Sequence, residues 1–289
     1  MSIRIIAIMM AAAVAFDGKS FATTQLEEVA LPAVPAELRE PQARADYIIV
    51  HFWDSVAPQA GMKAYSRQAI EQAFSNLISV FPYAGVEART EAAKAYFAIA
   101  RGDADDLSVL SAIADKYLYN PDSPVASDEY YEIFLTELLA NPTLDEAARV
   151  RPLWNLEIIR KNRPGSKAPD FPFITREGAA TSLYEVLAHL PMADTRVMLI
   201  FYDPDCDHCR ETIDGIIADR QTAVDVADSR LAIVAVYSGE ERELWESTAT
   251  SLPAEWTVGY EDGTLQDDGT YVLRTLPTIY NLASDGVIL

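Results

Sequence analysis

The chain has 289 residues, half of them hydrophobic, which is enough for two ordinary domains with apolar cores. Its formal net charge of −21 would repel nucleic acids and anionic membrane surfaces, so we expect neither as a partner. Both of its cysteines lie in one four-residue motif, so no disulfide framework holds the fold together.

The N-terminus has the features of an export signal. Arg4 precedes an apolar stretch at residues 5–16, which is shorter than the roughly 20 residues that a helix needs to span a bilayer. Small residues ending at Ala15 or Ala22 offer two cleavage sites. We expect residues 1–22 to be a signal peptide, the protein to be periplasmic or otherwise exported, and the mature chain to contain no membrane span. A buried N-terminal helix is the alternative.

The next region is expected to be helical. Residues 23–42 contain three prolines and no sustained hydrophobic period, which predicts an extended linker. Over residues 43–162, apolar side chains recur at helical spacing, as in residues 70–81, with turn and capping signals between the runs. This pattern predicts an all-helical domain of five or six short helices. Pro152 is expected to kink or interrupt the last of them.

One stretch of this region, residues 47–54, is rich in aromatic side chains and contains His51. Such a stretch could line a ligand site. Packed aromatic rings beside a hydrogen-bonded histidine are the more common arrangement, so we assign no site here.

The pattern changes after residues 161–167, where proline, glycine and charge predict a domain boundary. Beyond it, strands are expected at 171–175, 197–202, 231–236 and 256–258, helices at 182–190, 211–220 and 240–250, and a hairpin at 278–289. The fully apolar strands are typical of buried parallel strands. We therefore expect an α/β domain with a mixed sheet over residues 165–289.

The two cysteines follow one of these apolar strands. Residues 203–205, Asp-Pro-Asp, end the strand, and Cys206 begins the next helix, where unpaired N–H groups and the helix dipole favour a thiolate. Cys206 is therefore the expected nucleophile. Cys209, one turn further along, can attack a mixed disulfide formed at Cys206 and close a disulfide with it. These residues predict dithiol–disulfide chemistry.

The motif Cys206-Asp207-His208-Cys209, between a strand and a helix, resembles the active site of the thioredoxin superfamily. Residues 165–171 resemble the first strand of its redoxin branch, the thiol–disulfide interchange proteins (TlpA/ResA-like). Residues 275–278, Thr-Leu-Pro-Thr, resemble the superfamily's cis-proline segment. The resemblance covers residues 165–289 and implies a thioredoxin-like fold. The sequence contains no haem, flavin or nucleotide motif, so no cofactor is expected. It also implies exchange with protein thiols and disulfides and with an unidentified thiol electron donor or acceptor.

The resemblance also assigns roles around the cysteines. In the superfamily the proline faces the cysteine pair and the backbone before it pairs with a bound peptide, so Leu276 and Pro277 are the expected substrate-binding residues. Asp207 and His208 are expected to tune the site. The imidazole would favour a thiolate at Cys206 and the acidic neighbours would disfavour it, so the redox direction stays open.

The sequence departs from the superfamily at three points. Asp205 replaces the usual tryptophan before the first cysteine, and Ile200 replaces the buried acid six residues before it. The sequence also ends at Leu289, so the C-terminal helix that the superfamily adds after the hairpin is expected to be absent. The helical region, for its part, resembles a domain of unknown function that precedes thioredoxin-like domains in exported bacterial proteins.

The motif has three other interpretations. A metal site on Cys206, His208 and Cys209 lacks a fourth ligand, so no metal is expected. A peroxidase would carry a lone cysteine with Thr or Ser three residues before it. The residue three positions before Cys209 is Cys206 instead, which disfavours a peroxidase. The alternative that we keep is a non-catalytic docking module in which the cysteine pair forms a structural disulfide.

Overall fold

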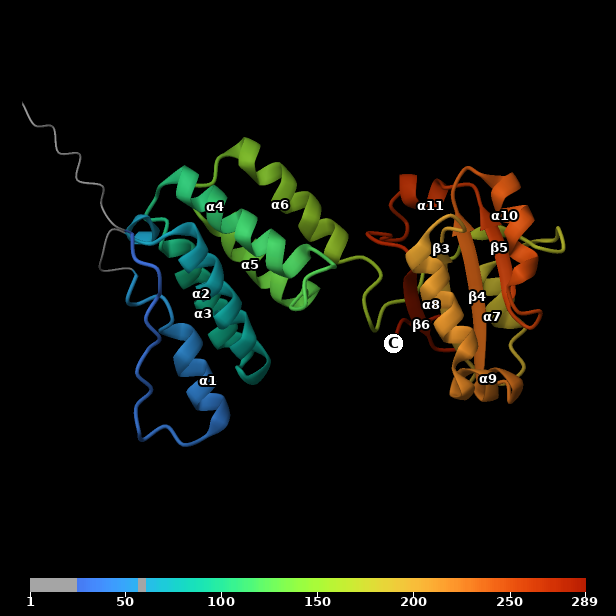
Figure 1. The fold of residues 1–289 in the computed structure, drawn as a ribbon, viewed down its shortest axis with the longest axis horizontal. Helices are drawn as coiled ribbons and strands as arrows, with labels where there is room; N and C mark the ends of the chain where they lie inside the picture. The colour runs from blue at the N-terminus through green and yellow to red at the C-terminus, as the bar shows by residue number, and fades with distance from the viewer. Residues whose placement is uncertain (1–24, 57–60) are drawn as a thin grey trace, which may run out of the picture.

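The structure, a computed structural model, describes residues 25–56 and 61–289 (Figure 1). Helices are the regular elements of the described residues between 41 and 159, and strands alternate with helices from residue 172 onward. The expected fold class, an all-α part followed by an α/β part, is confirmed. The predicted signal peptide, residues 1–22, lies outside the described residues.

Within the described residues, six α-helices build the first part: α1 (Pro41–Val50), α2 (Arg67–Val80), α3 (Val86–Ala98), α4 (Ala104–Ala114), α5 (Asp128–Ala140) and α6 (Glu146–Ile159). Four of them begin at a side-chain cap, because Ser66, Asp103, Ser127 and Asp145 each accept a backbone N–H of the first turn. In the part of the chain that is described, no helix combines the length and apolar character needed to cross a bilayer.

The helices pack around one core that is rich in aromatic rings. Phe52 and Trp53 are buried in it, and the Trp53 ring centroid lies 5.4 Å from that of Tyr96. His51 stays outside the core, with its Nδ1 atom 2.8 Å from a carboxylate oxygen of Asp54. The aromatic stretch around His51 therefore serves packing, as expected.

Two expectations for this part need correction. The segment before α1 is not a free linker, because the Leu26 N–H donates to the Ala64 carbonyl at 2.8 Å and Val29 is buried in the helical core. A single buried side chain such as Val29 produces no hydrophobic period, so the sequence pattern could not predict that this segment packs on the helices. Pro152 does not interrupt α6, which continues to Ile159, and the kink that was the other expectation stays a prediction. Pro152 itself is buried within the helical part.

The second part is built on a six-stranded sheet with the order β2-β1-β5-β4-β3-β6. The strands are β1 (Pro172–Thr175), β2 (Ala180–Ser182), β3 (Arg196–Tyr202), β4 (Leu231–Ser238), β5 (Thr257–Glu261) and β6 (Thr278–Leu282). The three central strands β3, β4 and β5 are parallel, and β6, β1 and β2 are antiparallel to their neighbours. The mixed sheet agrees with the expectation from the strand pattern.

Helices cover both faces of this sheet (Figure 1): α7 (Leu183–Ala188), α8 (Asp207–Ala218), α9 (Arg220–Ala227), α10 (Arg242–Thr248) and α11 (Thr264–Asp267). Successive side chains of a strand point to opposite faces, so β3 contributes to two cores. Leu199 and Phe201 pack on the face that α7 and α11 cover, and Ile200 and Tyr202 pack on the face of α8 and α10. Three short elements, β2, α9 and α11, were not predicted from the pattern.

Candidate active site

The cysteine pair lies where β3 ends and α8 begins. Asp203, the first residue after β3, builds the turn between them. Its carboxylate accepts the Asp205 N–H at 2.8 Å, and its carbonyl accepts the Cys206 N–H at 3.2 Å. A carboxylate that accepts the N–H two residues further on stabilises a turn without help from other segments. The turn leaves Cys206 as the N-cap residue of α8, with an extended backbone.

The sulfur of Cys206 is the cap of α8. Its Sγ atom accepts the backbone N–H of Cys209 at 3.2 Å, in the place where a serine or aspartate oxygen caps other helices. Both cysteines are free thiols. Cys206 is partly exposed, whereas the Cys209 side chain is 0% exposed. One sulfur can therefore meet a substrate directly and the other cannot.

Cys209 lies in an apolar environment. It packs with Ile200, Tyr202 and Ile213 in the core under α8. Burial raises the pKa of the Cys209 thiol to about 12, and the neighbouring Cys206 adds to the rise. Cys209 is therefore a protonated thiol at neutral pH.

The segment around Pro277 faces the cysteines. The carbonyl oxygen of Leu276 lies 3.9 Å from the Cys206 sulfur, and the peptide bond between Leu276 and Pro277 is cis. Among the described residues, no backbone group hydrogen-bonds to the N–H or the carbonyl of Leu276. Both groups thus lack a backbone partner that a bound polypeptide would have to displace, and the carbonyl has only the long contact from the Cys206 thiol.

Asp207 and His208 lie exposed on the first turn of α8. The Asp207 carboxylate forms an ion pair of 2.9 Å with Arg210, which lies on the next turn. His208 makes no hydrogen bond or ion pair with any residue that the structure describes. Neither side chain contacts a cysteine sulfur through such a bond, so their influence on the thiolate stays a prediction.

The break at residues 203–205 was predicted from the sequence, because Asp-Pro-Asp directly after an apolar strand is a turn signal. Arg274 was missed by sequence reasoning, since no local pattern marks it. It donates to the Asp128 carboxylate at 2.7 Å across 146 positions of sequence, and its guanidinium lies 4.9 Å from the ring centroid of Tyr119. Arg274 thereby ties the segment before Pro277 to the helical part.

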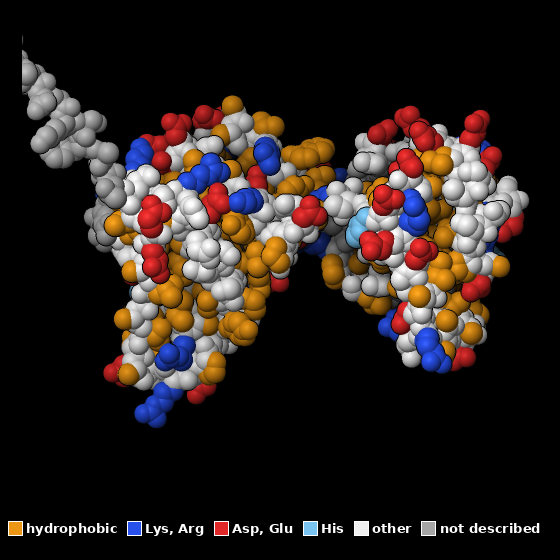
Figure 2. Space-filling model, viewed as in Figure 1, with side chains coloured by type: hydrophobic (Ala, Val, Ile, Leu, Met, Phe, Trp, Pro, Cys, Tyr) orange, Lys and Arg blue, Asp and Glu red, His pale blue; other side chains and the backbone are white. Residues whose placement is uncertain are grey.

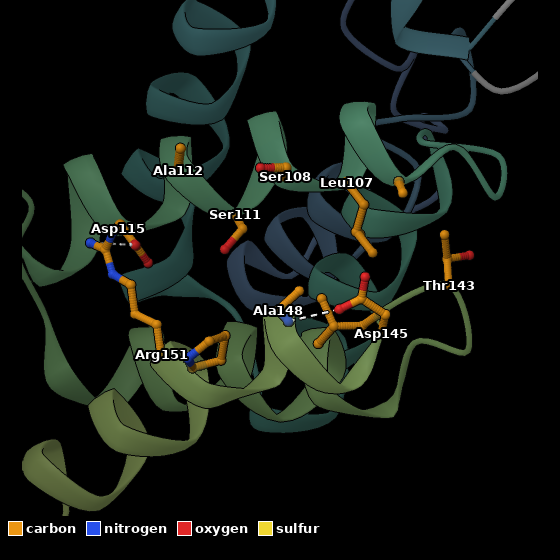
Figure 3. Close-up of a pocket in the computed structure, with 12 residues that line it drawn as sticks. Leu107, Ser108, Ser111, Ala112, Asp115, Thr143, Asp145, Ala148 and Arg151 are labelled. Carbon is orange, nitrogen blue, oxygen red and sulfur yellow. Dashed lines mark hydrogen bonds and ion pairs between the residues drawn. The ribbon is translucent and has the colours of Figure 1, made fainter.

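A separate cavity of about 240 Å³ lies within the helical part, between α4 and α6 (Figure 3). Ser111 points from α4 into the space between the two helices. Asp115 and Arg151 form an ion pair of 2.9 Å at one end, and Asp115 also accepts the hydroxyl of Tyr131. Asp115 and Arg151 neutralise each other, the Asp145 carboxylate caps α6 by accepting the Ala148 N–H at 2.8 Å, and the lining includes no residue of the α/β part. We assign no chemistry to it.

Comparison with solved structures identifies the fold. A thioredoxin-like protein from Bacteroides caccae is 28% identical, with a TM-score of 0.82 over 92% of this chain and 94% of that one. A conserved protein of unknown function from Bacteroides fragilis is 30% identical, with a TM-score of 0.40 over 44% of this chain and 89% of that one. The thioredoxin domain of a thiol-disulfide oxidoreductase from Bacteroides vulgatus is 20% identical, with a TM-score of 0.37 over 44% of this chain and 86% of that one. No curated protein matches the chain.

The first of these comparisons covers both parts of the molecule. A TM-score of 0.82 over 92% of the chain requires the helical part and the α/β part to superpose together, so both proteins share one relative arrangement of the two. The α/β part therefore has the thioredoxin-like fold that the resemblance implied. Residues 13–162, about half of the chain, match the family described as "Domain of unknown function (DUF5106)". The chain thus belongs to the family of this domain of unknown function, which is followed here by a thioredoxin-like fold.

Proposed function

We propose that this protein is an exported thiol–disulfide oxidoreductase that exchanges its Cys206–Cys209 dithiol with disulfides of protein substrates. One observation carries the proposal. The partly exposed sulfur of Cys206 caps α8 and lies 3.9 Å from the carbonyl of Leu276, and the N–H and carbonyl of Leu276 have no backbone partner among the described residues. A structural disulfide would not need open backbone groups beside it. A bound polypeptide strand would use them.

In the reducing direction, the Cys206 thiolate attacks one sulfur of the substrate disulfide. The substrate S–S bond breaks, a mixed disulfide forms at Cys206, and the second substrate sulfur leaves as a thiolate that takes up a proton. The N–H and carbonyl of Leu276 hold the substrate strand beside Pro277 during this step. The Cys209 thiolate then attacks the Cys206 sulfur and releases the substrate's other sulfur. The protein becomes the two-electron oxidised disulfide, which an external thiol donor reduces again. The oxidising direction runs these steps in reverse.

The second attack needs a proton acceptor, because only the thiolate is nucleophilic and burial raises the pKa of Cys209 to about 12. Ile200, which stands in the place of the superfamily's buried acid, cannot accept a proton. Asp203 is the acidic residue whose negative charge acts on Cys209. We therefore assign the role of proton acceptor for the Cys209 thiol to water or to the Asp203 carboxylate.

The reduction potential of the cysteine pair tests the proposal. The full chain would be equilibrated in glutathione or dithiothreitol buffers, and its free thiols would be trapped and counted. We expect a reversible two-electron couple, near about −270 mV for a reductase or near about −120 mV for an oxidase. A disulfide that persists far below about −300 mV would contradict the proposal and support the docking-module alternative.

Trapping of the mixed disulfide tests the roles of the two cysteines. Cys209→Ser should accumulate a mixed disulfide with a peptide disulfide, because nothing then releases the Cys206 sulfur. The matched control is Cys206→Ser, which keeps one cysteine and should trap no peptide. Equal trapping by both variants would show that the assignment of the nucleophile is wrong.

Export is the part of the proposal that rests on residues 1–22. The full chain and a chain without residues 2–22 would be expressed in the same Gram-negative host and located by fractionation. We expect the full chain to appear in the periplasm, shortened at its N-terminus, and the chain without residues 2–22 to stay in the cytoplasm. An unprocessed full chain in the cytoplasm would contradict export.

A further inference from the structure

The helical part forms one wall of a groove that begins at Pro277. The groove has a volume of about 330 Å³. Asp128 at the start of α5 and Ile158 near the end of α6 line it on one side, and Pro277 and Ile279 line it on the other. Thr275 and Pro277, the residues on either side of Leu276, both line the groove, so the groove lies next to the backbone segment that faces Cys206. A polypeptide bound along Leu276 and extended past Pro277 would reach the helical part.

The charged side chains of this groove already have partners. Arg274 donates to Asp128 at 2.7 Å, and the amine of Lys161 donates to the Gly269 carbonyl at 2.9 Å. These contacts cross from one part of the molecule to the other, so they also hold the groove in shape. Ile158 and Ile279 add apolar contact to a lining that is otherwise mostly polar, so most of the apolar surface that a ligand could use lies beyond the groove.

The apolar surface continues from the groove along α6. Val150, Trp154 and Ile158 are spaced four residues apart, so they lie on one face of the helix, and we call them the α6 stripe. The stripe is about 12 Å long at the usual helical rise. Val150 is 66% exposed and Trp154 is 60% exposed. Figure 2 shows hydrophobic side chains gathered over α6. A tryptophan this exposed beside other apolar side chains is typical of a binding surface.

We propose that the groove and the α6 stripe bind the substrate polypeptide in an extended conformation and accept a large apolar side chain close to its cysteine. This inference rests on the proposed function, because the groove's continuity with Leu276 and Pro277 is what directs the bound chain to Cys206. A recess of about 330 Å³ admits a strand or a side chain rather than a folded surface. Large apolar side chains are mostly buried in folded proteins, so the substrates selected are unfolded or partly folded chains.

A second copy of this chain fits the stripe less well. Each copy carries a net charge of −21, so two copies repel each other. A stable interface buries about 1,600 Å² in total, which is far more than three side chains provide. A dimer contact along α6 would also make no use of the groove beside Pro277.

Competing peptide substrates test the inference. The full chain would reduce two glutathione-capped cysteine peptides that differ at one position, tryptophan in one and serine in the other, a few residues from the cysteine. We expect a kcat/KM about tenfold higher for the tryptophan peptide. Trp154→Ala should remove most of this preference. The control is Tyr83→Ala, which removes an aromatic side chain that is 70% exposed elsewhere on the helical part and should keep the preference.

The outcomes separate this inference from the proposed function. If the wild type reduces both peptides but shows no preference, or if Trp154→Ala retains it, the docking surface is wrong and the oxidoreductase stands. If no peptide and no glutathione disulfide is reduced, and the cysteine pair also shows no reversible couple in the potential measurement, the oxidoreductase is wrong. The docking surface is then tested by binding. The Cys206→Ser/Cys209→Ser chain would be titrated with fluorescent versions of the two peptides in which serine replaces cysteine. Equal affinities for the two peptides overturn the docking surface, whereas an about tenfold preference for the tryptophan peptide that Trp154→Ala removes supports it. A dimer in sedimentation that Trp154→Ala dissociates would assign the stripe to a second copy and also overturn the proposal.

Discussion

Replacing Arg274 with alanine should loosen the contact between the two parts of the molecule. Arg274 forms an ion pair of 2.7 Å with Asp128, lies 4.9 Å from the ring centroid of Tyr119, and makes a longer hydrogen bond of 3.4 Å to the Tyr119 carbonyl. Its side chain is 29% exposed and that of Asp128 is 39% exposed, so solvent screens the ion pair. The pair then contributes about 0.5–1 kcal/mol, and the contact with the tyrosine ring about the same. Their loss, about 1–2 kcal/mol, raises the separated population about 5- to 30-fold.

Hydrogen exchange at Val272 measures this population. The Val272 N–H donates to the side-chain oxygen of Asn162 at 3.0 Å, and this bond also crosses between the two parts. In Arg274→Ala the Val272 amide should exchange about 5 to 30 times faster, while the amide of Val236 in the central strand β4 should not change. Arg210→Ala is the matched control, because its ion pair with Asp207 stays within the α/β part.

The reasoning is refuted if exchange at Val272 is the same in Arg274→Ala and in the control. It is also refuted if the double-mutant cycle of Arg274→Ala with Asp128→Ala gives a coupling energy below about 0.3 kcal/mol, which is the range of independent sites. A loss of protection in β4 as well would show that the substitution destabilises the whole domain rather than the contact.

An alkylating reagent at limiting concentration and neutral pH should label Cys206 before Cys209, because Cys209 is 0% exposed. Peptide mass spectrometry gives the order of labelling. If Cys209 were labelled first, the assignment of Cys206 as the nucleophile would be reversed. Release of a mixed disulfide by Cys209 should become about tenfold faster for each pH unit between about pH 7 and pH 9. Burial raises the Cys209 pKa to about 12, so throughout that range the thiolate fraction still grows with pH, and a flat profile in stopped-flow measurements would contradict this account. Gly259→Ala should lower the free energy of unfolding by about 1–3 kcal/mol, because the new Cβ would lie 2.3 Å from the Cδ2 atom of Phe173. Gly215→Ala, where a Cβ in helix α8 meets nothing within 4 Å, should instead raise it by about 0.5–1 kcal/mol, and denaturant unfolding of both variants measures the contrast.

Local sequence was sufficient to predict the strand and the helix start that position the two cysteines. The apolar run predicted at 197–202 is β3, which covers Arg196–Tyr202, and the predicted helix start at Cys206 is the N-cap of α8. These features depend on residues within one or two turns of each other, such as the Asp203 carboxylate and the Asp205 N–H. The periodic runs predicted the helices of the first part for the same reason, since each helix is stabilised largely by its own spacing of apolar side chains.

Contacts between distant residues could not be predicted in this way. The sequence showed Val150 and Trp154 as apolar positions of a helix, and only the packing of α6 shows that they lie outside the core. Val29 anchors a segment that looked like a linker, and Pro152 is held inside a continuous helix. In each case the side chain's partners come from other elements, so the outcome depends on tertiary packing.

The sequence by itself determined that Cys206 stands at a helix start and that the first part is helical, because both follow from short-range hydrogen bonding and apolar periodicity. The tertiary structure decided what surrounds Cys206. It brings the Leu276 carbonyl to the Cys206 sulfur across 70 positions, buries Cys209 under α8, and joins Arg274 to Asp128. These distances depend on how the strands are ordered and how the two parts pack, which the pairing of distant residues sets and no local pattern encodes.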